Sequence, residues 1–236
     1  MNIQNLVTKF QIEEKAARAG AEDRFFRICS FNLAEAGQRQ MEKAAFRTRT
    51  HLQEQMEIRA AVRFWDNPVL EGDVLRLDDK SLRCGAFAQI PRNVVKGAFV
   101  YLLTIGETGI EAEDYIMTEI YHDIWGTSYV ESALEVLRRD CLESQLEADL
   151  YLSESFGPGY FGMPLEEGKT LFSLLGDETA GVSQKASGLL LPEKSCMGLL
   201  LVYDRPGIRM PLACEKCLGS RGSCQFCEKR TLKELE

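Results

Sequence analysis

Residues 155–164 have the sequence Ser-Phe-Gly-Pro-Gly-Tyr-Phe-Gly-Met-Pro (SFGPGYFGMP), which places three glycines and two prolines around one tyrosine. Gly157-Pro158-Gly159-Tyr160 is typical of a type II turn, because proline presets the second position and glycine accepts the positive φ of the third. Such a turn leaves backbone N–H and C=O groups uncovered by side chains, so a flat ligand can lie against it. The alternative is a tight structural turn with a packed tyrosine, and composition alone does not separate the two.

The segments on both sides of this turn predict long helices and well-separated strands. A continuous apolar run of strand length ends at Gly106 and predicts a central strand. The predicted strands cover residues 98–105, 182–191 and 198–203, and the predicted helices cover residues 111–122, 128–150 and 164–175. This mixture favours an α+β fold, with an antiparallel or mixed sheet and long flanking helices.

The first 60 residues are predicted to form a helical arm, packed on the main body or on a second subunit. Four apolar residues have the i, i+3, i+4, i+7 spacing of a helix face: Ile3, Leu6, Val7 and Phe10. Gly20 is a candidate stop for this helix, and residues 23–59 predict one broken helix or two. We therefore expect an arm at 1–60, an α+β domain at 61–208 and a cysteine-rich tail at 209–236.

Composition and charge limit the possible functions of the 236-residue chain. Its hydrophobic fraction of 45% and charged fraction of 27% are those of a soluble globular protein. The sequence predicts neither a membrane span nor a signal peptide, so we expect a cytoplasmic location. Residues 66–236 carry 17 basic and 28 acidic side chains, which argues against nucleic-acid binding. One basic cluster is the only candidate exception, and its spacing fits the solvated face of a helix: Arg39, Lys43, Arg47 and Arg49.

The sequence offers few candidates for acid–base catalysis. The only two histidines, His51 and His122, lie in helical sequence without a Cys, Asp or Ser partner at a recognisable spacing. Phosphate-binding, nucleophile-elbow and dinucleotide-binding glycine motifs do not occur. If the protein is an enzyme, its reaction should need little proton transfer from side chains.

Three segments resemble, in the same order, the C-terminal reactivation domain of cobalamin-dependent methionine synthase. Gly157-Pro-Gly-Tyr160 occupies the Ala-Pro-Gly-Tyr positions of the Arg-x-Ala-Pro-Gly-Tyr-Pro segment of that family. Upstream, Val130-Glu-Ser-Ala-Leu-Glu135 resembles the helix whose first glutamate contacts the ligand. Downstream, five positions of the family's Gly-x-x-Leu-Thr-Glu-Ser-x-x-Met-x-Pro-x-x-Ser-x-x-Gly segment are kept: Gly181, Ser187, Pro192, Ser195 and Gly198. The resemblance covers about residues 80 to 203.

This resemblance implies the family's fold and an S-adenosylmethionine site. In the family, a one-electron reduction of Co(II) corrinoid is trapped by methyl transfer from S-adenosylmethionine, so the cofactor carries the chemistry. The implied partner is a corrinoid-binding protein or a cobalamin-dependent methyltransferase. Glu131 is then expected to hold the ligand's amino or hydroxyl end, and Tyr160 to face the corrinoid. The full set of implied ligand-binding residues is Glu131, Gly157, Pro158, Gly159, Tyr160 and Ser187.

The chain departs from the family pattern at two places. Ser155 stands where the family has its ligand-binding arginine, and Lys185-Ala186 replaces a Thr-Glu pair. A serine cannot imitate the planar, charged guanidinium donor. The pattern is more similar to shorter, stand-alone relatives found with anaerobic corrinoid methyltransferase systems. Two alternatives stay open: a non-catalytic interaction module, and an iron–sulfur protein that reduces the corrinoid. A homodimer is also compatible with the sequence.

The tail lies outside this resemblance and contains two Cys-x-x-Cys pairs separated by six residues. The four cysteines are Cys214, Cys217, Cys224 and Cys227. Gly219 and Gly222 let the loop between the pairs fold back, so that four thiolates can surround one tetrahedral zinc ion. The same thiolates can hold a [4Fe–4S] cluster. The spacing does not separate zinc from iron–sulfur, and free or disulfide-bonded cysteines are the third alternative.

Overall fold

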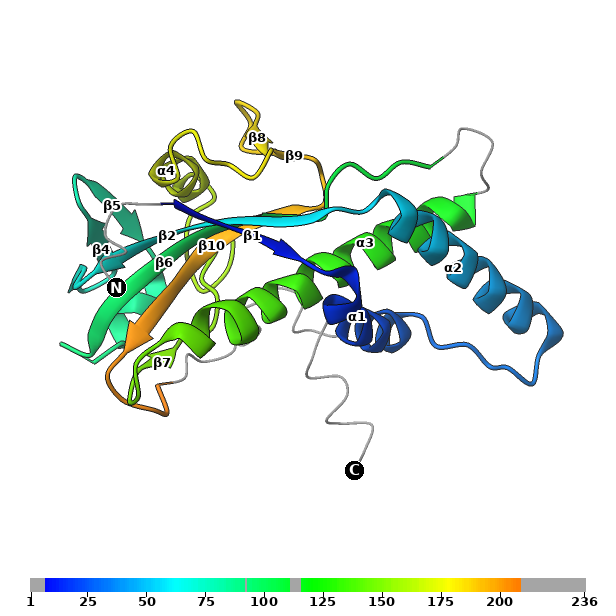
Figure 1. Ribbon diagram of the computed structural model, residues 1–236, viewed down its shortest axis with the longest axis horizontal. Helices are drawn as coiled ribbons and strands as arrows, with labels where there is room; N and C mark the ends of the chain where they lie inside the picture. Colours follow the sequence, from blue (N-terminus) through cyan, green and yellow to red (C-terminus); the bar gives the residue numbers. More distant parts are fainter. Residues whose placement is uncertain (1–6, 92, 111–115, 209–236) are drawn as a thin grey trace.

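The computed structural model describes residues 7–91, 93–110 and 116–208. Its centre is a five-stranded antiparallel sheet in the order β1-β2-β6-β10-β7 (Figure 1). The strands are β1 (Val7–Ile12), β2 (Ile58–Asp66), β6 (Val95–Thr104), β7 (Tyr151–Leu152) and β10 (Ser195–Tyr203). The fold is thus a mixture of helices and an antiparallel sheet, which confirms the predicted α+β class.

Strand β6 is central and explains the continuous apolar run in the sequence. It pairs with β2 on one side and with β10 on the other, so that Tyr101 lies opposite both Val62 and Gly198. Tyr101 and Leu103 belong to the core on the helical face, whereas Val100 and Leu102 belong to the core on the opposite face. A strand buried on both faces needs apolar residues at every position, which is why the prediction at 98–105 is confirmed.

Three long helices lie on one side of the sheet, where α1 and α2 pack mainly on α3 and α2 extends past the end of the strands (Figure 1). They are α1 (Glu14–Ile28), α2 (Ala36–Gln55) and α3 (Ile116–Val136), and α3 continues into a π-helical turn at Leu137–Leu142 and a 3-10 turn at Glu143–Gln145. Helix α1 packs on α3 mainly through one face made of small and aromatic residues. Its Phe25 ring stacks on Trp125 of α3 with 3.7 Å between ring centroids and 4° between ring planes. Such aromatic pairs stabilise a core beyond the area that they bury.

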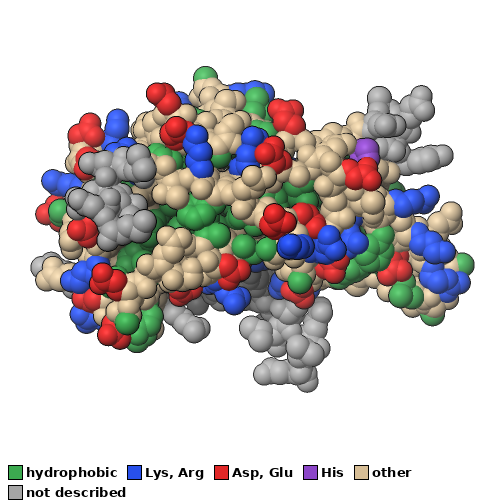
Figure 2. Space-filling model, in the orientation of Figure 1, with side chains coloured by type: hydrophobic (Ala, Val, Ile, Leu, Met, Phe, Trp, Pro, Cys, Tyr) green, Lys and Arg blue, Asp and Glu red, His purple; other side chains and the backbone are tan. Residues whose placement is uncertain are grey.

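Shorter elements cover the other face of the sheet. They are β3 (Val69–Glu71), β4 (Val74–Leu77), β5 (Lys80–Arg83), a 3-10 helix (Gly85–Gln89), α4 (Glu167–Leu174), β8 (Ser183–Gln184) and β9 (Leu190–Leu191). A second apolar core fills the space between these elements and the sheet. On the face shown in Figure 2, basic and acidic side chains are interspersed around a band of apolar side chains.

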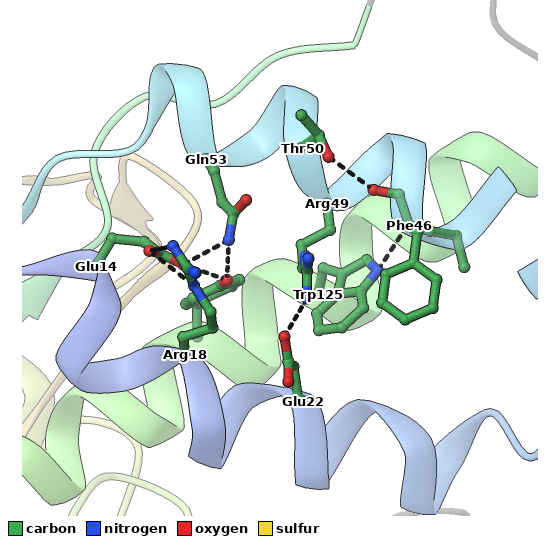
Figure 3. Close-up of polar contacts among 10 residues, drawn as sticks. Glu14, Arg18, Glu22, Phe46, Arg49, Thr50, Gln53 and Trp125 are labelled. Atoms are coloured by element: carbon green, nitrogen blue, oxygen red, sulfur yellow. Dashed lines mark hydrogen bonds and ion pairs between the residues drawn. The ribbon is translucent and has the colours of Figure 1, made fainter. Parts of the chain in front are cut away.

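A partly buried polar cluster fixes the start of α1 to the other two helices (Figure 3). The carboxylate of Glu14 accepts hydrogen bonds from Tyr129 Oη at 2.6 Å, from Gln53 Nε2 at 2.5 Å and from Arg18 at 2.6 Å. Burial by itself raises the pKa of Glu14, but these hydrogen bonds outweigh it, so the pKa lies below its usual value. The charged carboxylate is therefore part of the folded structure.

A second polar contact holds the middle of α1 (Figure 3). Glu22 forms an ion pair with Arg49 of α2. The guanidinium of Arg49 also lies over the rings of Phe46 and Trp125, with 5.0 Å and 5.6 Å to their centroids. A cation over an aromatic face is attracted by the negative potential of the ring. Helix α1 is thus fixed to its neighbours at two points along its length.

The N-terminal helix prediction is wrong in the described part of its range. Residues 7–10 lie in β1, whose register places Val7 opposite Arg63. The apolar spacing fitted a helix, but pairing with β2 decides the conformation, because tertiary context overrides local pattern. Gly20 does not end a helix and lies inside α1. The boundary expected between the arm and the α+β domain, at residue 61, falls inside β2. Helices α1 and α2 contribute to the same core as the sheet.

Two further predictions needed correction. The predicted strand at 182–191 is a hairpin of two short strands, β8 and β9. The two helices predicted at 111–122 and 128–150 are joined in α3, which runs without a break through Gly126. The side chain of Lys194 lies against this glycine, where an added Cβ would meet its Cε at 2.9 Å.

Among the described residues, no helix is long and apolar enough to cross a membrane.

Candidate functional site

A cleft of about 850 Å³ lies between α3, residues 151–160 and strand β10. Three of the residues predicted from sequence line it: Glu131, Gly157 and Tyr160. Pro158 and Gly159 complete the turn but do not line the cleft. Ser187 is exposed in the turn of the β8–β9 hairpin, where Gly188 N donates to Lys185 O at 2.8 Å, and it does not line the cleft either.

The glycine-rich turn has the conformation expected from its sequence. Tyr160 N donates to Gly157 O at 3.0 Å, and Gly159 has a φ of +84°. These are the two features of a type II turn. The side chain of Tyr160 is 63% exposed at the rim of the cleft. Leu165, which is 73% exposed, lies beside the turn, since a Cβ at Gly159 would be 3.3 Å from its Cδ2.

Ser155, which replaces the arginine of the resembled family, is bound to the sheet. Its Oγ lies 2.6 Å from the hydroxyl of Tyr101, a residue of β6 that is 2% exposed. Burial raises the pKa of Tyr101 well above its usual value, so the phenol stays neutral. The next residue, Phe156, exchanges two backbone hydrogen bonds with Leu199 of β10. The wall of the cleft is thus anchored to two strands.

Glu131 meets a partner that the sequence did not reveal. Nη1 of Arg24, on α1, donates to Oε2 of Glu131 at 2.7 Å. Both residues line the cleft, and the side chain of Arg24 is 30% exposed. A second pair lies further along α3, where Arg138 holds both carboxylate oxygens of Glu135 at 3.1 Å and 2.7 Å. The wall of the cleft formed by α3 therefore carries two carboxylates, each paired with an arginine.

Cys196 also lines the cleft as a free, partly buried thiol. Burial raises its pKa to about 12, and the nearby carboxylate of Glu131 acts in the same direction. Since the thiolate is the nucleophilic form of cysteine, this residue stays protonated at neutral pH. Neither histidine lines the cleft. Burial and then Lys194 lower the pKa of His122, which favours its neutral form.

One buried polar group at the cleft has no hydrogen-bond partner in the part of the chain that the structure describes. This group is the hydroxyl of Tyr203, a cleft-lining residue that is 2% exposed. A buried hydroxyl without a partner is unfavourable, and a polar ligand in the cleft can supply one. The Tyr203 hydroxyl is thus one group in the cleft that a polar ligand can satisfy.

The four cysteines of the tail, Cys214, Cys217, Cys224 and Cys227, lie outside the described residues. Within residues 7–91, 93–110 and 116–208, no three Cys, His, Asp or Glu side chains are grouped so as to hold a metal ion. The prediction of a zinc or [4Fe–4S] site in the tail therefore stays a prediction from sequence.

Comparisons with known proteins identify the fold. No family model matches the sequence, and no curated protein matches it. Among solved structures, the chain is similar to the crystal structure of the MetH reactivation domain bound to AdoHcy, with a TM-score of 0.61 and 14% sequence identity. The match covers 89% of this chain and 82% of that one. The chain thus has the fold of the MetH reactivation domain, as the sequence resemblance implied.

Proposed function

We propose that this protein binds S-adenosylmethionine, or its demethylated product AdoHcy, in the cleft beside the Gly157–Tyr160 turn. In this role it acts as a reactivation-type partner of a corrinoid protein. The observation that carries the proposal is the position of the turn. The segment that resembles the ligand-binding loop of the family lines the cleft, in a chain whose fold matches a domain crystallised with AdoHcy.

The composition of the cleft supports a binding role for the chain's own residues. Bound S-adenosylmethionine would supply the methyl group, and a reduced corrinoid of the partner would accept it. Glu131 would hold the ligand's cationic end, and the backbone of Gly157 would contact its polar atoms. Neither histidine lines the cleft, and the thiol of Cys196 stays protonated. Such a site positions a donor and does not move protons.

The exposed side chains at the rim suggest where the partner docks. Tyr160 and Leu165 are 63% and 73% exposed; Tyr160 follows Gly159 in the turn, and Leu165 Cδ2 would lie 3.3 Å from a Cβ at Gly159. Large apolar side chains in an otherwise polar surface often mark a contact with another molecule. We assign this rim to the corrinoid-bearing face of the partner protein.

Isothermal titration calorimetry with AdoHcy tests the proposal. We expect saturable binding to the purified 236-residue chain, and a rise in melting temperature with ligand concentration, because the ligand binds only the folded state. Tyr160→Ala should reduce binding of a corrinoid protein, whereas Leu33→Ala, at an exposed apolar residue outside the cleft, should not. Equal behaviour of the two variants would remove Tyr160 from the docking surface.

A second candidate function is a non-catalytic interaction module, and one observation favours it. Glu131, which is expected to bind the ligand, is already paired with Arg24, and Ser155, which stands at the position of the family's arginine, is bound to Tyr101. A chain that had lost its ligand would tie up these groups in this way. Absence of heat and of any melting-temperature shift at millimolar AdoHcy would favour this module over the ligand-binding protein.

A further inference from the structure

The ion pair between Arg24 and Glu131 joins two helices at the cleft and uses only part of each side chain. It consists of a single contact, from Nη1 of Arg24 to Oε2 of Glu131. The Nε and Nη2 groups of Arg24 have no partner among the described residues. A guanidinium can donate through all three nitrogens in a planar fork. Arg24 therefore retains two donors at the cleft.

Arg138, the other arginine that pairs with a carboxylate of α3 in the cleft, differs from Arg24 in this respect. Its Nε and Nη2 groups both bond to Glu135, and Nη1 lies 3.8 Å from Glu143. The hydrogen bond from Arg138 lowers the pKa of Glu135 below its usual value, so the pair is fully charged at neutral pH. Arg138 is committed to structure, whereas Arg24 keeps donors for a ligand.

The position of Arg24 is fixed by the packing of α1 on α3. Ser132 Oγ donates to Ala17 O at 2.6 Å. A Cβ added at Gly20 would lie 2.4 Å from Ser132 Oγ. The two helices are thus in close contact one turn before Arg24. The next residue, Phe25, is fully buried and stacks on Trp125. The packing fixes the backbone of Arg24, and the contact with Glu131 orders its guanidinium, which lowers the entropy lost when a ligand binds.

We propose that Arg24 and Glu131 form a subsite for a zwitterion, in which Arg24 binds the α-carboxylate and Glu131 the α-ammonium of an amino-acid group. This inference rests on the proposed function and extends it by assigning the recognition of the ligand's amino-acid portion to a residue of α1. A zwitterion can bind alongside the pair, with its carboxylate on the free edge of Arg24 and its ammonium on Glu131, and leave no charge unpaired. The pair is solvent-accessible, with side-chain exposures of 30% for Arg24 and 51% for Glu131, so it contributes little to stability by itself and is accessible to a ligand. A ligand with one charge, or none, would bind at most one of the two side chains.

The geometry of a guanidinium favours the carboxylate in this arrangement. Two parallel N–H donors of one guanidinium match the two oxygens of a carboxylate. The two nitrogens that Arg24 does not use for Glu131 are Nε and Nη2, which lie on one edge of the fork. Arg24 can therefore hold a carboxylate through this edge while Nη1 remains near Glu131.

Calorimetry with two ligands tests this subsite. AdoHcy carries the amino-acid group, whereas 5′-methylthioadenosine has the same adenosine and thioether without it. We expect Arg24→Gln to weaken AdoHcy binding at least tenfold, about 1.4 kcal/mol, and to leave methylthioadenosine binding unchanged. The matched control is Arg27→Gln on the same helix, because Arg27 pairs with Asp23 and does not line the cleft. Melting temperatures of both variants check that they fold.

The outcomes separate this inference from the proposed function. Suppose that the wild-type protein binds AdoHcy. If Arg24→Gln then binds AdoHcy equally well, or loses AdoHcy and methylthioadenosine binding to the same extent, the zwitterion subsite is wrong and the proposed function stands. If wild-type protein binds neither nucleoside, the proposed function fails. In that case L-methionine is titrated into the wild type and Arg24→Gln. Binding that depends on Arg24 supports the subsite, and absence of binding overturns it.

Discussion

The hydroxyl groups of Tyr101 and Ser155 lie 2.6 Å apart, so a buried residue of the central strand holds the loop that forms one wall of the cleft. We expect Ser155→Ala to leave the Tyr101 hydroxyl buried without a partner, at a cost of about 1–3 kcal/mol. Removing both hydroxyls in the Tyr101→Phe/Ser155→Ala double variant should cost less than the sum of the single changes. Urea unfolding of the four proteins measures this coupling, and additive losses would mean that the bond does not stabilise the fold.

Gly198 faces this hydrogen bond from β10 and has no room for a side chain. A Cβ there would lie 2.6 Å from Phe156 O and 2.7 Å from Tyr101 Oη. We expect Gly198→Ala to lower the free energy of unfolding by about 1–3 kcal/mol, because the backbone must shift. Gly37 in α2 is the control, since no atom lies within 4 Å of its added Cβ. Gly37→Ala should be neutral or stabilising by up to about 1 kcal/mol in a helix. Chemical denaturation compares the two variants.

Gly159 gives the turn its positive φ, and its replacement should affect both stability and binding. Alanine at a φ of +84° is strained, so Gly159→Ala should cost about 1–2 kcal/mol. Gly176→Ala carries the same kind of strain, at a φ of +62°, in open space away from the cleft. Both variants should lose similar stability, but only Gly159→Ala should weaken AdoHcy binding. If both bind AdoHcy like the wild type, the turn does not contact the ligand.

The cluster around Glu14 predicts a specific loss of stability in acid. The pKa of Glu14 is lowered in the folded protein, so its contribution is present above the usual value of about 4.3 and is lost as the pH falls through the lower, folded value. Glu14→Gln has no titratable carboxyl at this position. We therefore expect the wild type to be more stable than Glu14→Gln near neutral pH, and the difference to shrink below about pH 4. Thermal unfolding at a series of pH values measures it. A constant difference would exclude titration of Glu14 as its source.

The cysteine tail provides a prediction that depends on sequence alone. If four thiolates hold one ion, each chain should bind one metal, which Cys217→Ser or Cys224→Ser should remove while the main body stays folded. Elemental analysis detects zinc. A brown protein that absorbs near about 400 nm and is bleached by dithionite would instead indicate an iron–sulfur cluster and favour a redox role. Metal-free protein with four titratable thiols would exclude both.

Much of the sheet was predictable because its centre is buried on both faces. Residues 98–105 and 198–203 are apolar at nearly every position, and such runs need no knowledge of their neighbours to be identified. The edge strand β1 was not predictable in this way. Its apolar residues have helical spacing, and only the register with β2, which pairs Phe10 with Ala60, makes it a strand. Local pattern and long-range pairing conflict there, and pairing determines the structure.

Part of the candidate site could likewise be found from local sequence. The Gly157–Tyr160 turn and Glu131 were identified because each belongs to a recognisable segment. Arg24 was missed, since it lies on α1 and reaches Glu131, 107 positions later in the sequence, only through the packing of α1 on α3. The available signal was the pair of small residues Ala17 and Ala21 on one face of α1. Both are fully buried and let α1 approach α3 closely. It indicates close packing but does not say which charged residue then meets the cleft.

The position of β6 between β2 and β10 has a consequence for how the chain is made. Ser195 and Thr104, which face each other across this pairing, are 91 positions apart in sequence. A ribosome therefore completes α1, α2, β6 and α3 well before it reaches the strand that closes the sheet. Until then, one edge of β6 has unpaired backbone groups beside apolar side chains, the kind of surface that aggregates. The nascent chain thus cannot complete its sheet before residue 203 is synthesised, and we expect chaperones to bind it up to that point.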